Sequence, residues 1–282
     1  MKILFFGASG LFGTAFEAVC AAPGIEFAGV THGDVEVTDH GAVTALIDAH
    51  QPTVVVNAVA IVGIDPCEER PDLAYAVNAA APLAMGLHCA AKDICFVQTS
   101  THAVFDGSKS TAYTEVDRPN PISVYSVSKF AGECFVRDVC PKHYITRFPT
   151  MYGRRRNASP GFVDKMLDRF RQGVEIRVAD DKFDSPSYAH DVATGLADLL
   201  QTKRPYGTYH LANAGNVNYY EFISALKELL GANNPVHRAK DRDFPGRGHK
   251  PLRTAITSSR LPPMRDWRAA LAEYVSQQLE PA

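Results

Sequence analysis

A glycine-rich turn near the start of the chain is the feature that most constrains its fold. The mostly apolar run Lys2-Ile3-Leu4-Phe5-Phe6 has the length of one strand, and Gly7-Ala8-Ser9-Gly10-Leu11-Phe12-Gly13 follows it directly and opens a helical segment that reaches Cys20. This order of strand, glycine turn and helix is typical of a dinucleotide-binding unit. Glycines let the backbone approach a pyrophosphate, and a helix N-terminus attracts its charge. The pattern therefore predicts a nucleotide site at residues 7–13.

Strand-like and helix-like segments alternate along the first half of the chain. Residues 25–30, 53–57, 94–98 and 144–148 are expected to be strands, and the helices expected between them are residues 39–50, residues 73–91 and a segment from Tyr125 to residue 139. Such alternation predicts an α/β fold with a doubly wound parallel sheet. Ligands of these sheets lie at the carboxyl ends of the strands. Residues 7–13, Asn57, Ser100 and Thr101 all fall at such ends.

The pattern loosens beyond Pro149. Helices are expected at residues 162–171, 190–200 and 220–230, strands at 174–178 and 207–211, and loops at 213–217 and 233–251. We therefore expect a dinucleotide-binding Rossmann domain, residues 1–148 joined by part of 174–212. A smaller C-terminal α/β lobe, residues 149–173 and 213–282, is expected to bind the substrate across a cleft.

Tyr125 and Lys129 lie four residues apart, so they share one face of a helix. An ammonium beside a phenol favours the phenolate and lowers the phenol pKa from its ordinary value of about 10. A tyrosine held in this way exchanges a proton near neutral pH. The spacing alone also fits a packed tyrosine beside a solvated lysine, and the rest of the chain decides between the two.

Composition argues against several partner classes. The formal net charge is −2 and the only dense basic run is Arg154-Arg155-Arg156, so neither nucleic acid nor an anionic membrane is expected as a partner. The six cysteines form no Cys-x-x-Cys pair, as in a protein of a reducing compartment. The first apolar run is too short for a signal peptide or a membrane span, so a cytoplasmic protein is expected. The acidic residues between Asp65 and Asp72 match no ligand template, so no metal is expected.

Four features occur in one order along the chain: the glycine turn, Asn57-Ala58-Val59 after the third strand, Ser100-Thr101 after the fourth, and Tyr125-x-x-x-Lys129. Together they resemble the extended short-chain dehydrogenase/reductase superfamily, and within it the dTDP-4-dehydrorhamnose reductase family. The stretches that carry this resemblance span nearly the whole chain: residues 100–107, 121–129, 131–133, 152–153, 185–188 and 206–210, with Arg147, Asp191, Lys250 and Pro251.

The resemblance implies an NAD(P)H-dependent reductase of a nucleotide-linked 4-keto-6-deoxysugar. Tyr125 would protonate the ketone as general acid while hydride arrives from the nicotinamide. Lys129 would hold the nicotinamide ribose and lower the tyrosine pKa, and Thr101 would bind the carbonyl oxygen. The cofactor contacts that it implies are Gly7, Ser9, Gly10, Leu11, Phe12, Gly13, Thr31, His32, Glu36, Val37, Asn57, Ala58, Val59, Ala60, Thr99, Ser100, Tyr125, Lys129, Phe148 and Pro149. The expected substrate contacts are Val62, Thr101, His102, Val104, Thr150, Arg154 and Lys250.

The departures from the family pattern gather where the substrate is expected. His102 stands where these reductases usually carry Asp, Ile61-Val62 replaces an aromatic-hydroxyl pair, Pro149-Thr150 replaces Ser-Trp, and Gly161 replaces Asn. The sugar or its base is therefore expected to differ. His102 is either an additional acid or a packed imidazole, and Arg154 to Arg156 are either a diphosphate clamp or a solvated loop.

Cofactor choice is only faintly marked in the sequence. The end of the second expected strand reads Thr31-His32, without the carboxylate that favours NAD, so NADP is slightly preferred over NAD. Two other functions remain open: a 4-epimerase of the same superfamily, and a non-catalytic NADP-binding subunit similar to the β subunit of methionine adenosyltransferase. His102-Ala103 argues against a dehydratase, which needs an acidic pair there. A homodimer through residues 73–91 and 123–139 is a further hypothesis.

Overall fold

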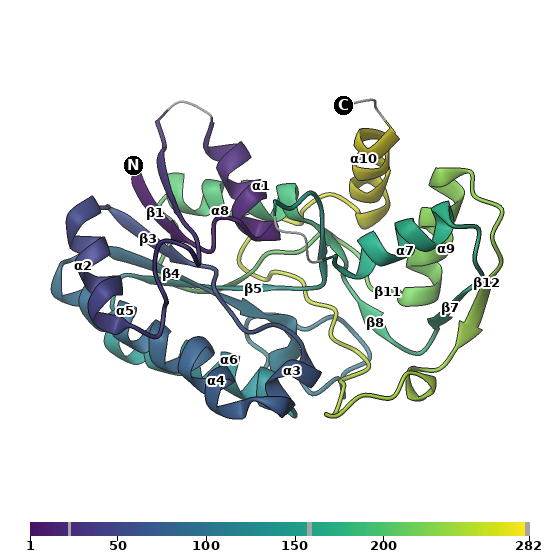
Figure 1. The fold of residues 1–282 in the computed structure, drawn as a ribbon, viewed down its shortest axis with the longest axis horizontal. Helices are drawn as coiled ribbons and strands as arrows, with labels where there is room; N and C mark the ends of the chain where they lie inside the picture. The colour runs from purple at the N-terminus through teal and green to yellow at the C-terminus, as the bar shows by residue number, and fades with distance from the viewer. Residues whose placement is uncertain (22–23, 157–159, 280–282) are drawn as a thin grey trace.

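The computed structural model describes residues 1–21, 24–156 and 160–279. Six parallel strands form the central sheet in the order β10-β5-β4-β3-β1-β2 (Figure 1). Strand order reverses between β1 and β3, which is the crevice where doubly wound sheets bind ligands. The predicted α/β fold with a doubly wound parallel sheet is therefore confirmed. The six strands are β1 (Lys2–Phe6), β2 (Glu26–Val30), β3 (Val54–Asn57), β4 (Cys95–Thr101), β5 (His143–Phe148) and β10 (Gly207–His210).

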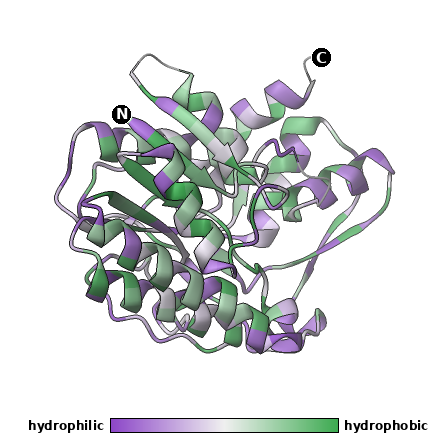
Figure 2. Ribbon diagram, turned by 60° about the vertical axis from the view of Figure 1, so that its left-hand side comes forward, coloured by the Kyte–Doolittle hydropathy of each residue, from purple (hydrophilic) through white to green (hydrophobic). Residues whose placement is uncertain are grey.

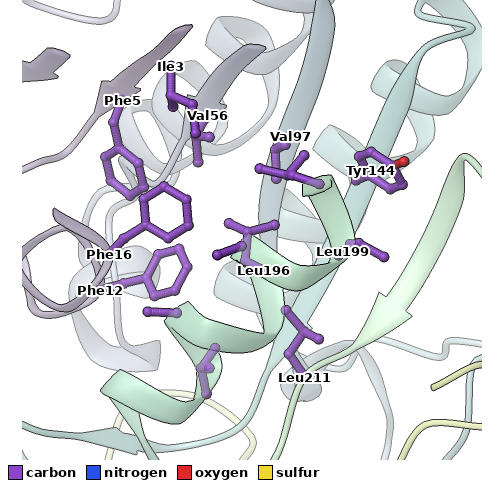
Figure 3. Close-up of a cluster of buried hydrophobic side chains, with 14 of the residues drawn as sticks. Ile3, Phe5, Phe12, Phe16, Val56, Val97, Tyr144, Leu196, Leu199 and Leu211 are labelled. Atoms are coloured by element: carbon purple, nitrogen blue, oxygen red, sulfur yellow. The ribbon is translucent and has the colours of Figure 1, made fainter. Parts of the chain in front are cut away.

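Helices cover both faces of this sheet, and the alternating direction of the side chains of β1 shows why. Ile3 and Phe5 point into a cluster with α1 and α8, which Figure 3 shows, whereas Leu4 and Phe6 point into a cluster on the opposite face. Apolar side chains thus leave β1 on both sides, as a strand buried on both faces requires. In Figure 2 green is concentrated on the central strands, and the surrounding helices alternate green with purple. The covering helices are α1 (Leu11–Cys20) and α8 (Ala189–Gln201) on one face, and α2 (His40–His50), α5 (Ala81–Ala91) and α6 (Val124–Val139) on the other.

The helix expected at residues 73–91 contains a turn of a different kind. The structure has α4 (Pro71–Tyr75), a π-helical turn (Ala76–Ala80) and α5 in immediate succession. By length and composition Pro71–Ala91 is the one helix in the described ranges that could cross a membrane, which is weak evidence, and half of its most apolar window is buried inside the fold. The preceding short helix, α3 (Ile64–Glu69), was not expected from the sequence.

A third apolar cluster gathers in the C-terminal part of the chain around Tyr152, Phe222 and Trp267. Residues 233–251 were expected to be a loop, but they contain β12, which pairs in parallel with β7. The helix α10 was also missed. Residues 157–159 and 280–282 of the expected smaller lobe lie outside the described residues. The elements here are α7 (Phe162–Arg171), α9 (Tyr219–Leu230), α10 (Trp267–Leu279), β6 (Met151–Tyr152), β7 (Ile176–Ala179), β8 (Phe183–Asp184), β9 (Ser187–Tyr188), β11 (Val217–Asn218) and β12 (Val236–Ala239).

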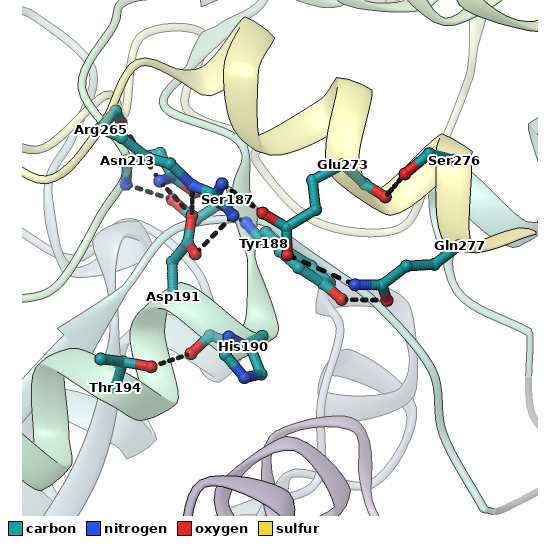
Figure 4. Close-up of polar contacts among 10 residues, drawn as sticks. All are labelled: Ser187, Tyr188, His190, Asp191, Thr194, Asn213, Arg265, Glu273, Ser276 and Gln277. Atoms are coloured by element: carbon teal, nitrogen blue, oxygen red, sulfur yellow. Dashed lines mark hydrogen bonds and ion pairs between the residues drawn. The ribbon is translucent and has the colours of Figure 1, made fainter.

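A polar network attaches α10 to the elements beside the main sheet (Figure 4). Arg265, just before α10, donates from Nε and Nη2 to the two carboxylate oxygens of Asp191 in α8, both at 2.7 Å. Tyr188 donates its hydroxyl to Gln277 in α10 at 2.8 Å. Bidentate arginine–carboxylate pairs fix orientation as well as distance. The last helix therefore has a defined position relative to α8.

Candidate active site

The glycine turn after β1 has the geometry that a dinucleotide requires. Gly7 has a φ of 91°, in the left-handed region that favours glycine. A Cβ atom on Gly13 would lie 2.5 Å from the Gly7 carbonyl oxygen, so the turn packs directly on the first turn of α1. Gly10 begins α1 without a side-chain cap, and the leading N–H groups of the helix therefore have no capping side chain. These donors, at the positive end of a helix, fit a pyrophosphate.

The end of β3 is held by buried amides. Asn57 is 1% exposed, and its Nδ2 donates to Gln98 Oε1 at 2.9 Å while its Oδ1 accepts from Val59 N at 3.1 Å. Asn78, in the π-helical turn, accepts from Ile61 N at 3.0 Å. Two amide side chains thus fix the loop that contains Ala58, Val59 and Ala60. Asn78 was not predicted, although a lone Asn in an alanine-rich helix was a readable signal.

Tyr125 lies in the first turn of α6, against the end of β4. Ser123 caps this helix by accepting from Ser126 N, and Val124 N donates to Glu68 at 2.9 Å, so the start of α6 is fixed. The Thr101 side chain hydrogen-bonds Tyr125. The structure therefore brings two of the predicted catalytic residues into contact at the carboxyl end of the sheet.

The predicted lowering of the Tyr125 pKa is wrong for this structure. Burial raises the pKa of Tyr125 to about 12, and the hydrogen bond from Thr101 only partly offsets it. The Lys129 ammonium is directed elsewhere: Nζ donates to the backbone carbonyl of Thr99 at 2.8 Å. Burial lowers the pKa of Lys129 to about 8, against the opposing influence of Glu133. Spacing placed the two residues on one face, but it could not show that Lys129 is buried and Tyr125 half-buried.

A buried ion pair lies one helical turn beyond Lys129. Arg147 of β5 donates from Nε to Glu133 Oε1 at 2.9 Å and from Nη2 to Oε2 at 2.6 Å. The Ser100 hydroxyl also donates to Glu133. Both charged side chains are at most 3% exposed. This pair joins α6, β4 and β5 beneath the residues expected to be catalytic, and the sequence had marked Glu133 and Arg147 only through the resemblance.

His102 faces a buried carboxylate that the sequence did not predict. His102 Nδ1 lies 3.3 Å from Oδ1 of Asp184, whose side chain is 1% exposed. Asp184 Oδ2 accepts from Thr150 N at 3.2 Å, and Thr150 Oγ1 contacts the Tyr219 hydroxyl at 3.1 Å. Burial lowers the His102 pKa, Asp184 raises it and Lys182 lowers it further. Two of the expected substrate contacts, His102 and Thr150, are thus brought together around Asp184.

Other expected substrate contacts are placed differently. The side chain of Val104 was expected to contact the substrate, but it is 0% exposed and packs in a core cluster with Phe105. It is therefore not available to a ligand. Arg154 donates to the backbone carbonyl of Gln277 in α10 at 2.7 Å, and Lys250 donates to a backbone carbonyl at 2.9 Å. Val62 is 68% exposed. In the described part of the chain, neither Arg154 nor Lys250 forms a hydrogen bond with the cluster around Asp184.

The end of β2, where the adenosine is expected, carries an acid that was not predicted from the sequence. Asp34 Oδ2 accepts from both the amide and the hydroxyl of Thr31, each at 2.7 Å. These hydrogen bonds lower the Asp34 pKa. His32 lies 3.5 Å from Glu36, and Val37 is buried. A carboxylate is therefore held at the strand end although the two residues directly after β2 are Thr and His.

Two further observations bear on the site. Among the described residues, no three His, Cys, Asp or Glu side chains are grouped to hold a metal ion. A cavity of about 790 Å³ lies between α8 and the segment that precedes α10, with His190, Asp198 and Leu261 in its lining. Thr101, Tyr125 and Lys129 are not part of this lining, so the cavity and the predicted catalytic residues are separate features.

Comparison with known proteins agrees with this geometry. The family described as RmlD substrate binding domain matches residues 1–280. A dTDP-4-dehydrorhamnose reductase of Streptomyces griseus is 33% identical over 278 residues, covering 95% of this chain and 90% of that protein. The spore coat polysaccharide biosynthesis protein SpsK of Bacillus subtilis is 29% identical over 282 residues, covering 98% of each.

Solved structures show the same fold. A dTDP-4-dehydrorhamnose reductase from Clostridium acetobutylicum superimposes with a TM-score of 0.94 at 30% identity, covering 99% of this chain and 100% of that one. A dTDP-4-dehydrorhamnose reductase from Bacillus anthracis, solved in complex with NADP, gives a TM-score of 0.93 at 24% identity and covers 98% of this chain and 99% of that one. The chain therefore belongs to the RmlD family, the dTDP-4-dehydrorhamnose reductase family of extended short-chain dehydrogenases/reductases.

Proposed function

We propose that this protein is an NAD(P)H-dependent reductase of a nucleotide-linked 4-keto-6-deoxysugar. The observation that carries the proposal is the contact of Tyr125 with Thr101 above the buried Lys129, at the carboxyl ends of β4 and β5. A glycine turn that fits a pyrophosphate lies at the end of β1 in the same sheet. The relatives named dTDP-4-dehydrorhamnose reductase support the substrate class.

In this proposal the bound dinucleotide supplies a hydride to the ketone carbon, and the chain supplies the proton. Tyr125 donates its phenolic proton to the carbonyl oxygen, so that ketone, hydride and proton together give the alcohol. The raised pKa keeps the phenol protonated at neutral pH, which is the form a general acid requires. Thr101 hydrogen-bonds the same oxygen, where negative charge develops.

Lys129 contributes its charge and its hydrogen-bond donors to this chemistry. Its pKa of about 8 leaves the ammonium mostly charged at neutral pH, and its bond to the Thr99 carbonyl fixes one of its three donors. The other donors are proposed to hold the nicotinamide ribose. Residues 7–13, Asn57 to Ala60, Thr99, Ser100, Phe148 and Pro149 are proposed to line the rest of the cofactor. The rings of Phe12 and Phe148 pack at a tilt with centroids 4.7 Å apart, and both side chains are buried, so their contribution is through the backbone.

The two-lobe division is part of the same proposal. Residues 1–148, with part of 174–212, form the cofactor-binding lobe, and residues 149–173 and 213–282 form the substrate lobe. Pairing of β10 with β5 and the separate apolar cluster around Phe222 support the division. The nucleotide sugar lies between the lobes, near His102 and Thr150.

A homodimer is proposed through the helices on one face of the sheet. Tyr75 in α4, Leu87 in α5 and Phe135 in α6 are 41%, 52% and 41% exposed, and an interface over these helices would bury them. Light scattering at micromolar concentration tests this, and a monomer would refute it. The cytoplasm is the proposed location, since a reduced nicotinamide cofactor and free cysteines suit a reducing compartment.

The deciding experiment follows oxidation of NADPH and NADH with a panel of nucleotide-linked 4-keto-6-deoxysugars, in the parent and in Tyr125→Phe. Turnover that falls at least about a hundredfold in the variant supports the reductase, because general-acid catalysis contributes about 10²–10⁴-fold. Parent protein that interconverts 4-epimers without net NADPH loss supports an epimerase. Tight NADPH binding with no turnover of any sugar supports a non-catalytic subunit instead.

A further inference from the structure

His102 has an unpaired buried nitrogen directly beside Thr101. Its Nδ1 atom is buried and makes no hydrogen bond. Asp184 Oδ1 lies 3.3 Å away, within reach of a hydrogen bond but not aligned for one. The imidazole side chain keeps 15% of its surface exposed. His102 therefore faces a carboxylate with one nitrogen while part of its ring remains accessible.

Asp184 is held in place independently of His102. Its Oδ1 accepts from Ser185 N at 2.8 Å, and its Oδ2 accepts from Thr150 N at 3.2 Å. The Tyr219 hydroxyl of α9 also hydrogen-bonds this carboxylate. The donors come from the loop after β5, from the residue after β8 and from α9, so the carboxylate is a fixed reference point at which both lobes meet. A buried carboxylate held in this way orients a neighbouring imidazole.

The protonation of His102 follows from its surroundings. Burial, the largest influence, lowers its pKa, Asp184 opposes this and Lys182 adds to it. The ring is therefore neutral at neutral pH. A neutral imidazole has one N–H donor and one acceptor nitrogen, and the partner of the first decides which is which. With Nδ1 facing Asp184, the proton lies on Nδ1 and Nε2 is an acceptor.

We propose that His102 is a substrate-positioning residue: Asp184 orients it through Nδ1–H, and Nε2 accepts a hydrogen bond from a hydroxyl of the sugar next to the reacting carbonyl. This inference rests on the proposed reductase function. The neighbouring Thr101 contacts Tyr125, so the accessible part of His102 is one residue from the site of proton transfer. Hydrogen bonds at such sites are often poorly aligned before substrate binds and tighten in the complex.

Two variants with matched polarity test the acceptor. His102→Asn keeps an amide near the position of Nδ1, where it donates to Asp184, but has no atom at the position of Nε2. His102→Gln places its amide oxygen near Nε2. We expect His102→Asn to raise KM for the nucleotide sugar roughly threefold to tenfold, the effect of one lost hydrogen bond, with kcat nearly unchanged. His102→Gln is expected to recover most of that affinity.

NADPH affinity, measured by fluorescence titration, separates positioning from damage to the fold. It is expected to stay unchanged in both variants. If both variants keep the parental KM, the inference is overturned while the reductase function stands. A loss of NADPH affinity equal to the loss of sugar affinity would also overturn the inference. If the parent itself reduces no sugar, the proposed function fails, and this inference fails with it.

The tautomer of His102 gives a readout that needs no turnover. Nitrogen-15 NMR of the imidazole, with His102 assigned by its absence from the His102→Asn spectrum, is expected to show a neutral ring protonated on Nδ1. The binary complex with NADP⁺ is a suitable sample, because it keeps the protein in a defined state. A neutral ring protonated on Nε2 would overturn the orientation by Asp184.

Discussion

The buried pair of Glu133 and Arg147 offers a test of how the site is held together. Arg147→Met would remove both charge-assisted hydrogen bonds from the Glu133 carboxylate, which is 0% exposed. Among the described residues it would leave the Ser100 hydroxyl, the half-exposed Arg137 at 3.7 Å and the charge of Lys129 as partners. Breaking a buried pair in this way costs about 3–5 kcal/mol of unfolding free energy, because a charge stays buried without its main partner. At about 2–4 °C per kcal/mol, the melting temperature should fall by roughly 6–20 °C.

The double variant with Glu133→Met and Arg147→Met makes the test specific. Removing both charges avoids the uncompensated carboxylate, so the double variant should be more stable than Arg147→Met alone, although it retains the cavity left by a shorter side chain. Urea denaturation of the parent, both single variants and the double variant gives the coupling energy. A coupling free energy below about 1 kcal/mol would refute the reasoning. So would a double variant whose loss of unfolding free energy equals the sum of the losses in the two single variants.

The same double variant should remain impaired in turnover even where it folds. Glu133 raises the Lys129 pKa against the larger influence of burial, so its removal should lower that pKa below about 8 and leave less of the ammonium charged at neutral pH. Recovery of stability without recovery of activity would therefore locate the function of the pair in the charge of Lys129. Full activity in a stable double variant would contradict this.

Three further results are expected. Asp34→Ala should raise the preference for NADPH over NADH in affinity measurements, because a carboxylate held by Thr31 repels a 2′-phosphate; an unchanged ratio would place that carboxylate away from the cofactor. Gly13→Ala should weaken NADPH binding and cost about 1–3 kcal/mol in urea denaturation, because its Cβ would lie 2.5 Å from the Gly7 oxygen. Affinity for NADPH should fall as pH rises through about 8, where Lys129 loses its proton, and a flat profile from pH 7 to about 9.5 would rule out its charge as the cause.

Local signals explain what could be predicted from the sequence. The strands that are buried on both faces are continuous apolar runs, and the glycine turn follows the first of them directly, so β1, α1 and the parallel sheet were readable. By contrast, β12 lies in a segment rich in Asn, Gly and Pro, and its pairing with β7 is a contact between segments about 60 residues apart, which no local pattern contains. Tertiary pairing overrode weak local preference there.

The residues of the candidate site also fall into a group that could be predicted from the sequence and a group that could not. Thr101, Tyr125 and Lys129 could be predicted because a resemblance fixed their order and spacing. Asp184 and Asp34 could not, because the first meets His102 from more than 80 positions away and the second reaches Thr31 by a local fold of the backbone. Burial was also invisible, and it reversed the expected direction of the Tyr125 pKa.

The π-helical turn at Ala76–Ala80 means that the helix carries one residue more than regular α-helical geometry accommodates. Deleting one residue there would let the backbone return to an ordinary helix, yet each residue of an α-helix turns by about 100°, so everything on one side of the deletion would rotate by that angle. Asn78 would then leave the loop at Ile61 and the Ser128 hydroxyl of α6, both of which it now contacts. The extra residue therefore acts as an angular spacer that aligns the loop at Ile61 with α6, and length variation in this segment is constrained by orientation more than by helix stability.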